Sequence, residues 1–153
     1  MAGNKKPRKP GAKRVRTFVS KGMLPIIYRT PAEDDQTLKL MPHTDLSELR
    51  EGRGKDEHYW CVSNRLNWAS TLASMIEFSF DPAPVLNAGL DAMLALSERH
   101  KLVGAYVFKA DELKAVGDAL ILADDMHDAT TRRQHRDALV KLEGILPGQG
   151  AGA

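Results

Sequence analysis

The chain has 153 residues, 42% of them hydrophobic, and a net charge of +2. This length suits one domain, and no apolar stretch approaches the roughly 18 residues that a membrane span requires. A single cysteine, Cys61, excludes an internal disulfide framework. Since no apolar run follows the basic N-terminus, we expect no secretory signal and predict a cytoplasmic protein.

The small net charge conceals a strong asymmetry along the chain. Residues 1–21 hold eight basic side chains and no acidic one, whereas residues 22–153 hold 14 basic and 20 acidic side chains. Two prolines and a glycine interrupt any helix near the N-terminus, and the segment is too polar to build a core. The predicted organisation is a disordered basic arm, a single helical domain and a flexible tail, over residues 1–16, 17–146 and 147–153 respectively.

The first part of the predicted domain, residues 17–43, has the pattern of extended chain. The runs MLPIIYR (residues 23–29) and TLKLM (residues 37–41) are rich in β-forming or alternating apolar residues, and they can pair as a small hairpin. Pro25 restricts the first run to an edge strand, and Pro42 ends the second.

From residue 44 onward the spacing of apolar residues predicts helices. The first begins at Thr44 or Asp45 and ends at the glycines of GRGK (residues 52–55), which we interpret as a linker rather than a phosphate-binding loop. Asp56 is the predicted cap of the next helix, and AYVF (residues 105–108) is a short strand or an extended link. The later helices are predicted over residues 57–79, 83–100, 110–127 and 131–144. The fold class is therefore mainly α, a compact bundle of four to five helices with a short extended N-terminal element.

Two of these helices carry more apolar surface than a surface helix needs. Between residues 59 and 76 the only charged side chain is Arg65, and the helix over residues 83–100 is apolar nearly all round. Surface helices normally carry more charge. Two interpretations stay open: the helices form the core of a single chain, or they form a homodimer interface or a docking face for another protein. In the helix over residues 57–79, the predicted apolar stripe consists of Val62, Leu66, Ala69, Ala73, Ile76 and Phe80.

The residues suited to catalysis or metal binding form no established motif. One group with helical spacing consists of Asp124, Asp125, His127 and Asp128. It lacks an identifiable ligand from a second element, so a solvated acidic helix end explains it better. His58 and Cys61 are three residues apart, yet Cys61 lies among apolar neighbours and is interpreted as a buried, inert thiol. We therefore predict no metal, no cofactor and no enzymatic activity.

Positive charge is the clearest functional signal. A basic segment neutralises phosphates and gives salt-sensitive, sequence-independent binding to nucleic acid. The last helix begins at a capping box between Thr131 and Gln134 and adds three arginines. The candidate nucleic-acid-binding residues are Lys5, Lys6, Arg8, Lys9, Lys13, Arg14, Arg16, Arg132, Arg133 and Arg136. A solubilising tail explains the basic segment equally well.

Three sequence pieces, KKPRKP, FVSKGMLPI and AGLDAMLAL with the following GAYVFKADELKAVGDALILADDMHDATT, together resemble a group of small proteins encoded by prophages and plasmids of proteobacteria. The shared features are a Lys/Pro-rich start, a GM-x-P segment, a Gly-Leu-Asp-Ala helix and an acidic helix end. Ala123 and Asp124 stand where the group has Leu-His, which weakens a metal site further. The resemblance implies a genomic setting and no assigned activity.

These observations lead to two functional hypotheses. The first is a non-enzymatic accessory or regulatory protein of a mobile genetic element, which binds nucleic acid non-specifically through its basic arm and forms a homodimer through its apolar helices. The second is a protein–protein interaction module that acts on a host or phage protein, with the arm contacting an acidic surface. Neither hypothesis requires a membrane.

Overall fold

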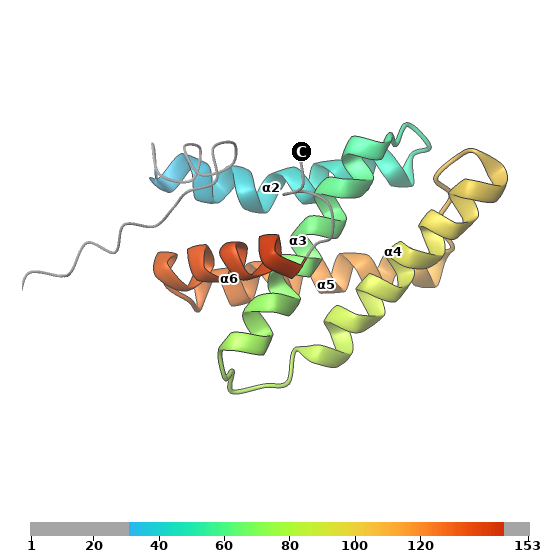
Figure 1. Ribbon diagram of the computed structural model, residues 1–153. Coiled ribbons are helices and arrows are strands. Elements are labelled where there is room, and N and C mark those ends of the chain that lie inside the picture. The colour runs from blue at the N-terminus through green and yellow to red at the C-terminus, as the bar shows by residue number, and fades with distance from the viewer. Residues whose placement is uncertain (1–30, 146–153) are drawn as a thin grey trace, which may run out of the picture. The chain divides into compact units, whose positions relative to one another are not determined.

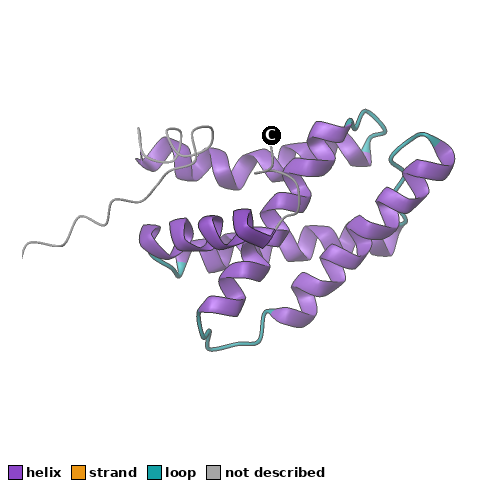
Figure 2. Cartoon of the chain, viewed as in Figure 1, coloured by secondary structure: helices purple, strands orange, loops and turns teal. Residues whose placement is uncertain are grey.

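The computed structural model describes residues 31–145, with side chains from Gln36 to Gly144. The helices are α2 (Pro31–Arg50), α3 (Asp56–Met75), α4 (Ala83–Val103), α5 (Ala110–Asp128) and α6 (Arg132–Ile145) (Figure 1). All regular secondary structure in these residues is helical (Figure 2), which confirms the predicted bundle. The predicted arm, the MLPIIYR run and the tail lie outside the described residues. The chain divides into two units after Asp35, and the second unit is described here by itself.

The prediction of extended chain is wrong from Pro31 onward, because α2 covers this segment. The TLKLM run, residues 37–41, is helical, and Pro42 lies inside the helix instead of ending a strand. Leucine, lysine and methionine are strong helix formers, and an alternation of five residues is too short to outweigh that preference. The predicted stop is confirmed, since Gly52 follows α2 with the left-handed φ of +77° that glycine adopts readily.

The start of α3 differs from the prediction by one residue. Lys55, not Asp56, is the N-cap, and its backbone N–H donates to Nδ1 of His58 at 2.9 Å. Asp56 instead accepts a hydrogen bond of 2.6 Å from the Tyr106 hydroxyl. In a capping box, a Glu or Gln side chain usually accepts the hydrogen bond from the N–H of the N-cap residue. Here the His58 imidazole accepts it, so the sequence pattern did not identify Lys55 as the N-cap.

The end of α3 comes four residues before the predicted one. The helix ends at Met75, and Ile76 is extended. Thr71 and Ser74 both turn their hydroxyls onto backbone carbonyls of the preceding turn, a bond that competes with the helix. Phe80, predicted as part of the stripe, therefore lies beyond the helix and is 44% exposed.

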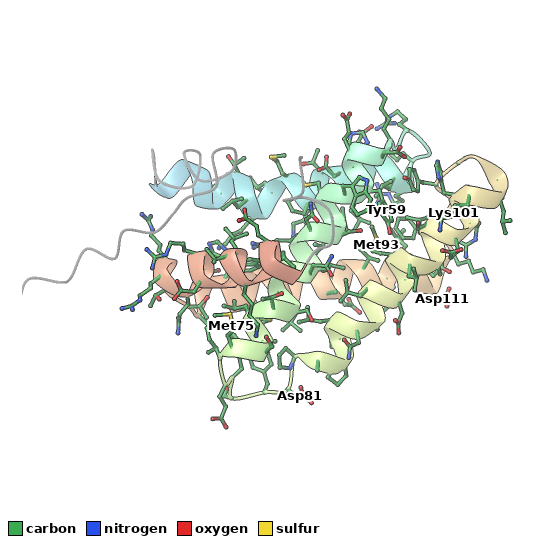
Figure 3. The ribbon with its side chains drawn as sticks, viewed as in Figure 1. Tyr59, Met75, Asp81, Met93, Lys101 and Asp111 are labelled. Atoms are coloured by element: carbon green, nitrogen blue, oxygen red, sulfur yellow. The ribbon has the colours of Figure 1, made fainter. Side chains whose placement is uncertain are left out.

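The core lies around α3, which contacts α4, α5 and α6 (Figure 1). Tyr59 of α3 and Met93 of α4 lie on the facing sides of their helices, and Met75 and Asp81 mark the connection between these helices (Figure 3). The buried part of the α3 stripe agrees with the prediction as far as residue 69. It consists of Val62, Leu66, Ala69 and Leu72, each 0% exposed.

The helices α4 and α5 form the most closely packed pair. A Cβ placed on Gly89 of α4 would lie 2.5 Å from Cβ of Ala119 in α5, so only a glycine permits this approach. At the other end of the pair, Arg99 donates two hydrogen bonds to the Glu112 carboxylate, at 2.7 and 2.9 Å. The AYVF segment between the helices contains no strand and is an extended link.

This core accounts for most of the apolar surplus of α3, where Trp60 and Met75 stay 58% and 40% exposed, and for a smaller part of that of α4. The buried residues of α4 include Leu86, Met93 and Leu96, which are at most 2% exposed. In contrast, Leu94 and Leu102 of the same helix are 60% and 88% exposed. The single-chain interpretation therefore explains most of the apolar surface of α3, and the outer side of α4 retains apolar surface.

Candidate functional site

The predicted arginines of α6 have unequal surroundings. Arg132 and Arg133 are exposed in the first turn, whereas Arg136 is half-buried and lies 3.3 Å from the Asp137 carboxylate. The structure therefore brings two of the three arginines to one exposed turn. The other predicted binding residues, in the arm over residues 5–16, lie outside the described residues.

The first turn of α6 combines two sources of positive potential. The predicted capping box is confirmed, because the Thr131 N–H donates to Gln134 Oε1 at 2.9 Å and the Gln134 N–H donates to Thr131 Oγ1 at 3.3 Å. The turn contains no acidic residue. Cations at a helix N-terminus oppose the helix dipole and cost about 0.3–1 kcal/mol each. Arg132 and Arg133 therefore add positive potential to the helix end that already favours anions.

A second polar site, here called the charge cluster, joins α2, α3 and α5. Oδ1 of Asp124 accepts a hydrogen bond from Arg65 Nη2 at 3.0 Å, and its Oδ2 lies 2.7 Å from Nε2 of His43. A second ion pair connects Lys39 of α2 to Asp128 of α5. The charge cluster consists of Lys39, His43, Arg65, Asp124 and Asp128.

Burial decreases from the centre of the charge cluster to its edge. The side chain of Arg65 is 8% exposed, that of Asp124 is 23% exposed and that of Asp128 is 62% exposed. Burial lowers the pKa of Arg65, and the Asp124 carboxylate opposes that shift, so the guanidinium keeps its charge. The Lys39 ammonium lowers the pKa of Asp128.

The acidic–histidine group on α5 is thus only partly the solvated helix end of the prediction. Asp125 and Asp128 are exposed, but Asp124 is half-buried and His127 is buried. Cations from α2 and α3 occupy the carboxylates of Asp124 and Asp128. Within the described residues, no three histidine, cysteine or acidic side chains are placed to hold a metal ion.

An aromatic cluster lies next to Arg65, where α3, α5 and α6 meet. The Arg65 guanidinium lies 4.5 Å from the centre of the Trp68 ring, and its Nη1 lies 3.4 Å from Nδ1 of His127. Because arginine only donates hydrogen bonds, Nδ1 of His127 is the acceptor. His135 stacks on His127 with ring centres 4.1 Å apart, and its Nε2 donates to the His127 carbonyl at 3.0 Å.

Cys61 lies at the contact between α2 and α3. Its side chain is half-buried rather than buried as predicted, and burial together with the facing Asp45 carboxylate raises the pKa of the thiol to about 12. His58 uses Nδ1 to cap α3. The interpretation of Cys61 as an unreactive thiol agrees with this pKa.

Most positive charge in the second unit is paired within the fold. Thirteen lysines and arginines lie between residues 36 and 145. At least eight of them lie within 4.0 Å of a carboxylate, namely Lys39, Arg50, Arg53, Arg65, Arg99, Lys101, Lys114 and Arg136. The same pairing is not available inside residues 1–21, which contain no acid.

Sequence reasoning missed the charge cluster. Lys39 and His43 lie in the segment predicted as extended, so their side chains were not placed opposite α5. The acidic partner of Arg65 was predictable in kind. Arg65 is the only charged residue on a long apolar stretch of helix, and a buried arginine requires a carboxylate partner. Asp124 was noticed as an acidic residue, but its partners could not be read from spacing along α5.

No family model, no curated protein and no solved structure matches this chain. Among the described helices, none combines the length and the apolar character that crossing a membrane requires.

Proposed function

We propose that the protein binds nucleic acid through its basic N-terminal segment, with Arg132 and Arg133 of α6 as an additional contact. The observation that carries the proposal is the division of charge. Positive side chains between residues 36 and 145 are mostly paired with nearby carboxylates, whereas residues 5–16 hold seven positive side chains and no acid. Such a segment attracts a polyanion.

The chemistry of this binding is electrostatic and independent of sequence. Lysine and arginine neutralise phosphates and release the ions condensed on nucleic acid, so affinity falls steeply with salt. Within α6, Arg132 and Arg133 lie where backbone N–H groups and the helix dipole also favour an anion.

The test compares the full-length protein with a full-length variant in which the seven basic residues of the segment are replaced by glutamine. Binding to DNA and RNA oligonucleotides is measured by fluorescence anisotropy over a salt series. If the segment contacts five to seven phosphates, the slope of log K against log salt is about −4 to −6 for the wild type. The variant is expected to lose most of that slope.

Two further variants complete this test. Replacing Arg132 and Arg133 with glutamine is expected to reduce the slope by about 1 to 2. In the matched control, glutamine replaces Arg50 and Lys101, which are paired with Glu51 and Glu98. The slope of log K against log salt is expected to change little in this control. Wild-type protein that fails to bind either nucleic acid at low salt contradicts the proposal.

A second candidate function, protein–protein contact that begins with self-association of this chain, is favoured by the exposed apolar corner between α4 and α5. Leu102, Val103 and Val107 are 88%, 64% and 50% exposed, and exposed apolar groups that lie close together mark interaction sites. Sedimentation of the wild type and of a Leu102→Glu variant tests self-association at this corner. A wild-type protein that sediments as a monomer at all concentrations contradicts self-association.

A further inference from the structure

Helix α6 is attached to the fold along one side. It crosses and contacts α3 (Figure 1), and its inward side chains Ala138 and Leu142 are 0% and 8% exposed. The Trp68 indole of α3 also donates a hydrogen bond of 3.3 Å to the His135 carbonyl of α6. A turn of three residues, 129–131, joins the helix to α5. These contacts hold α6 in place and leave its opposite side to solvent.

The opposite side of α6, here called the outer face, carries three of the four positive side chains of the helix. Its members recur every three or four residues, and they are Arg132, Arg133, Arg136 and Val140. All of them are exposed except Arg136, which is half-buried. The first five residues of the helix, RRQHR, contain no acid. The acids of α6 come later, namely Asp137 beside Arg136 and Glu143 toward the other end.

We infer that the outer face of α6 binds double-stranded DNA, with the helix lying in the major groove and its arginines on the phosphates along the groove edges. This role of α6 rests on the proposed nucleic-acid binding and names the partner more closely. The form of the duplex is recognised through the shape of its groove and the position of its phosphates, and no base sequence is selected.

The dimensions of the helix and of the DNA groove agree. α6 has 14 residues, so it is about 21 Å long and about 10–12 Å across with its side chains. The major groove of B-form DNA is about 12 Å wide and admits one α-helix. The major groove of double-stranded RNA is deep and narrow, and side chains cannot read it. A helix that is fixed on one side and basic on the other therefore favours a DNA duplex over an RNA duplex.

The side chains of α6 indicate the same partner. Arginine binds phosphate through two parallel hydrogen bonds, and the three arginines lie in the first two turns of the helix, where backbone N–H groups also favour an anion. Among the described side chains of α6, the exposed ones include no aromatic ring. Proteins that hold single strands stack the bases on aromatic rings, so the outer face suits a duplex better than a single strand.

The acidic end of α5, which precedes the turn, is partly neutralised. Asp124 and Asp128 form ion pairs with Arg65 and Lys39, and Asp125 is exposed. The paired carboxylates offset less of the positive potential of the outer face than unpaired ones, because each has a cation beside it. The face therefore keeps a positive potential that complements the phosphates.

The experiment measures the affinity of the full-length protein for two duplexes of the same length and sequence, one of DNA and one of RNA. Fluorescence anisotropy at low salt gives both binding constants, and the readout is their ratio. Both duplexes carry the same number of phosphates, so the basic N-terminal segment contributes to both affinities. The wild type is expected to bind the DNA duplex at least about five-fold more tightly than the RNA duplex.

Substitutions separate the outer face from positive charge in general. Arg133→Gln should reduce the ratio about two-fold, and glutamine at all three arginine positions of the face should bring it close to one. The matched control Lys141→Gln removes one positive charge from the other side of the same helix, where Lys141 donates to Ser74 of α3 at 3.0 Å. It should leave the ratio unchanged. Circular dichroism establishes that each variant is folded.

Two results would overturn this role of α6. One is a wild type that binds both duplexes equally or prefers RNA, and the other is a triple variant that keeps the wild-type ratio. The variant with seven glutamines in the basic segment separates this failure from failure of the proposed function. If that variant loses the salt slope while the wild-type ratio is one, the segment binds nucleic acid and α6 does not. If it binds like the wild type and keeps a ratio above five, α6 binds DNA and the segment does not.

Discussion

The pair α4–α5 and the helix α2 show two different ways of attaching a helix to the same core. Between α4 and α5 the contact is apolar and close, with Gly89 against Ala119 and with Leu120 only 1% exposed. In contrast, α2 reaches α5 through polar side chains, Lys39 beside Asp128 and His43 beside Asp124. The first contact depends mainly on shape, whereas the second depends on charge and is therefore weakened by salt.

One helix, α5, therefore makes both kinds of contact. α5 presents small and aliphatic residues to α4 and acidic residues to α2, and the acidic side is made stable by Arg65 from α3. The buried arginine between these contacts is the ion-pair partner of the half-buried Asp124.

The largest effect is expected from Arg65→Met, which removes the charge that holds Asp124. Breaking a buried ion pair costs about 3–5 kcal/mol. Because Asp124 is 23% exposed and keeps its contact with His43, we expect the free energy of unfolding to fall by about 2–4 kcal/mol. Urea denaturation followed by circular dichroism measures it. The control Arg50→Met, on an exposed pair, should change stability by less than about 0.5 kcal/mol. Equal effects of the two substitutions would show that the charge cluster is not a buried centre.

A smaller effect, with opposite signs at two glycines, is expected in the α4–α5 pair. Gly89→Ala places a Cβ 2.5 Å from Ala119 and should destabilise the protein by about 1–3 kcal/mol. Gly117→Ala, in the interior of α5 with nothing within 4 Å of the new Cβ, should stabilise it by up to about 1 kcal/mol. Thermal unfolding at neutral pH compares the two variants. A stabilising Gly89→Ala would show that the helices are further apart than described.

The smallest effect concerns the ion pair at the end of the α4–α5 pair. Hydrogen bonds from Arg99 lower the pKa of Glu112, so the pair stabilises the protein above the unfolded pKa of roughly 4.3 and is lost as the pH falls through the lower folded value. Glu112→Gln should therefore reduce stability at pH 7, and its stability should converge with that of the wild type once the pH is below the folded pKa of Glu112. Chemical denaturation at several pH values measures this convergence. A constant difference between the two proteins at all pH values would contradict it.

The fold was largely predictable because α3, α4, α5 and α6 each carry an apolar stripe of helical period. The error at α2 has a physical cause, since between residues 36 and 50 the fully buried side chains are only Pro42, Leu46 and Leu49, and an ion pair such as that of Lys39 leaves no periodic signal. The charge cluster was not predictable because His43, Arg65 and Asp124 come from three helices, and their meeting depends on how α2 packs. By contrast, the capping box at Thr131 was predictable because both of its partners lie within one turn.

The surroundings of Trp68 give the protein a built-in optical signal. Its indole is 5% exposed, lies against the Arg65 guanidinium and the rings of His127 and His135, and donates to the His135 carbonyl. The other indole, Trp60, is 58% exposed, so its fluorescence falls at longer wavelength than that of a buried tryptophan. A Trp60→Phe variant would therefore leave Trp68 as the one tryptophan, at the junction of α3, α5 and α6. The wavelength and intensity of its fluorescence would then report changes in the packing of that junction without any added label.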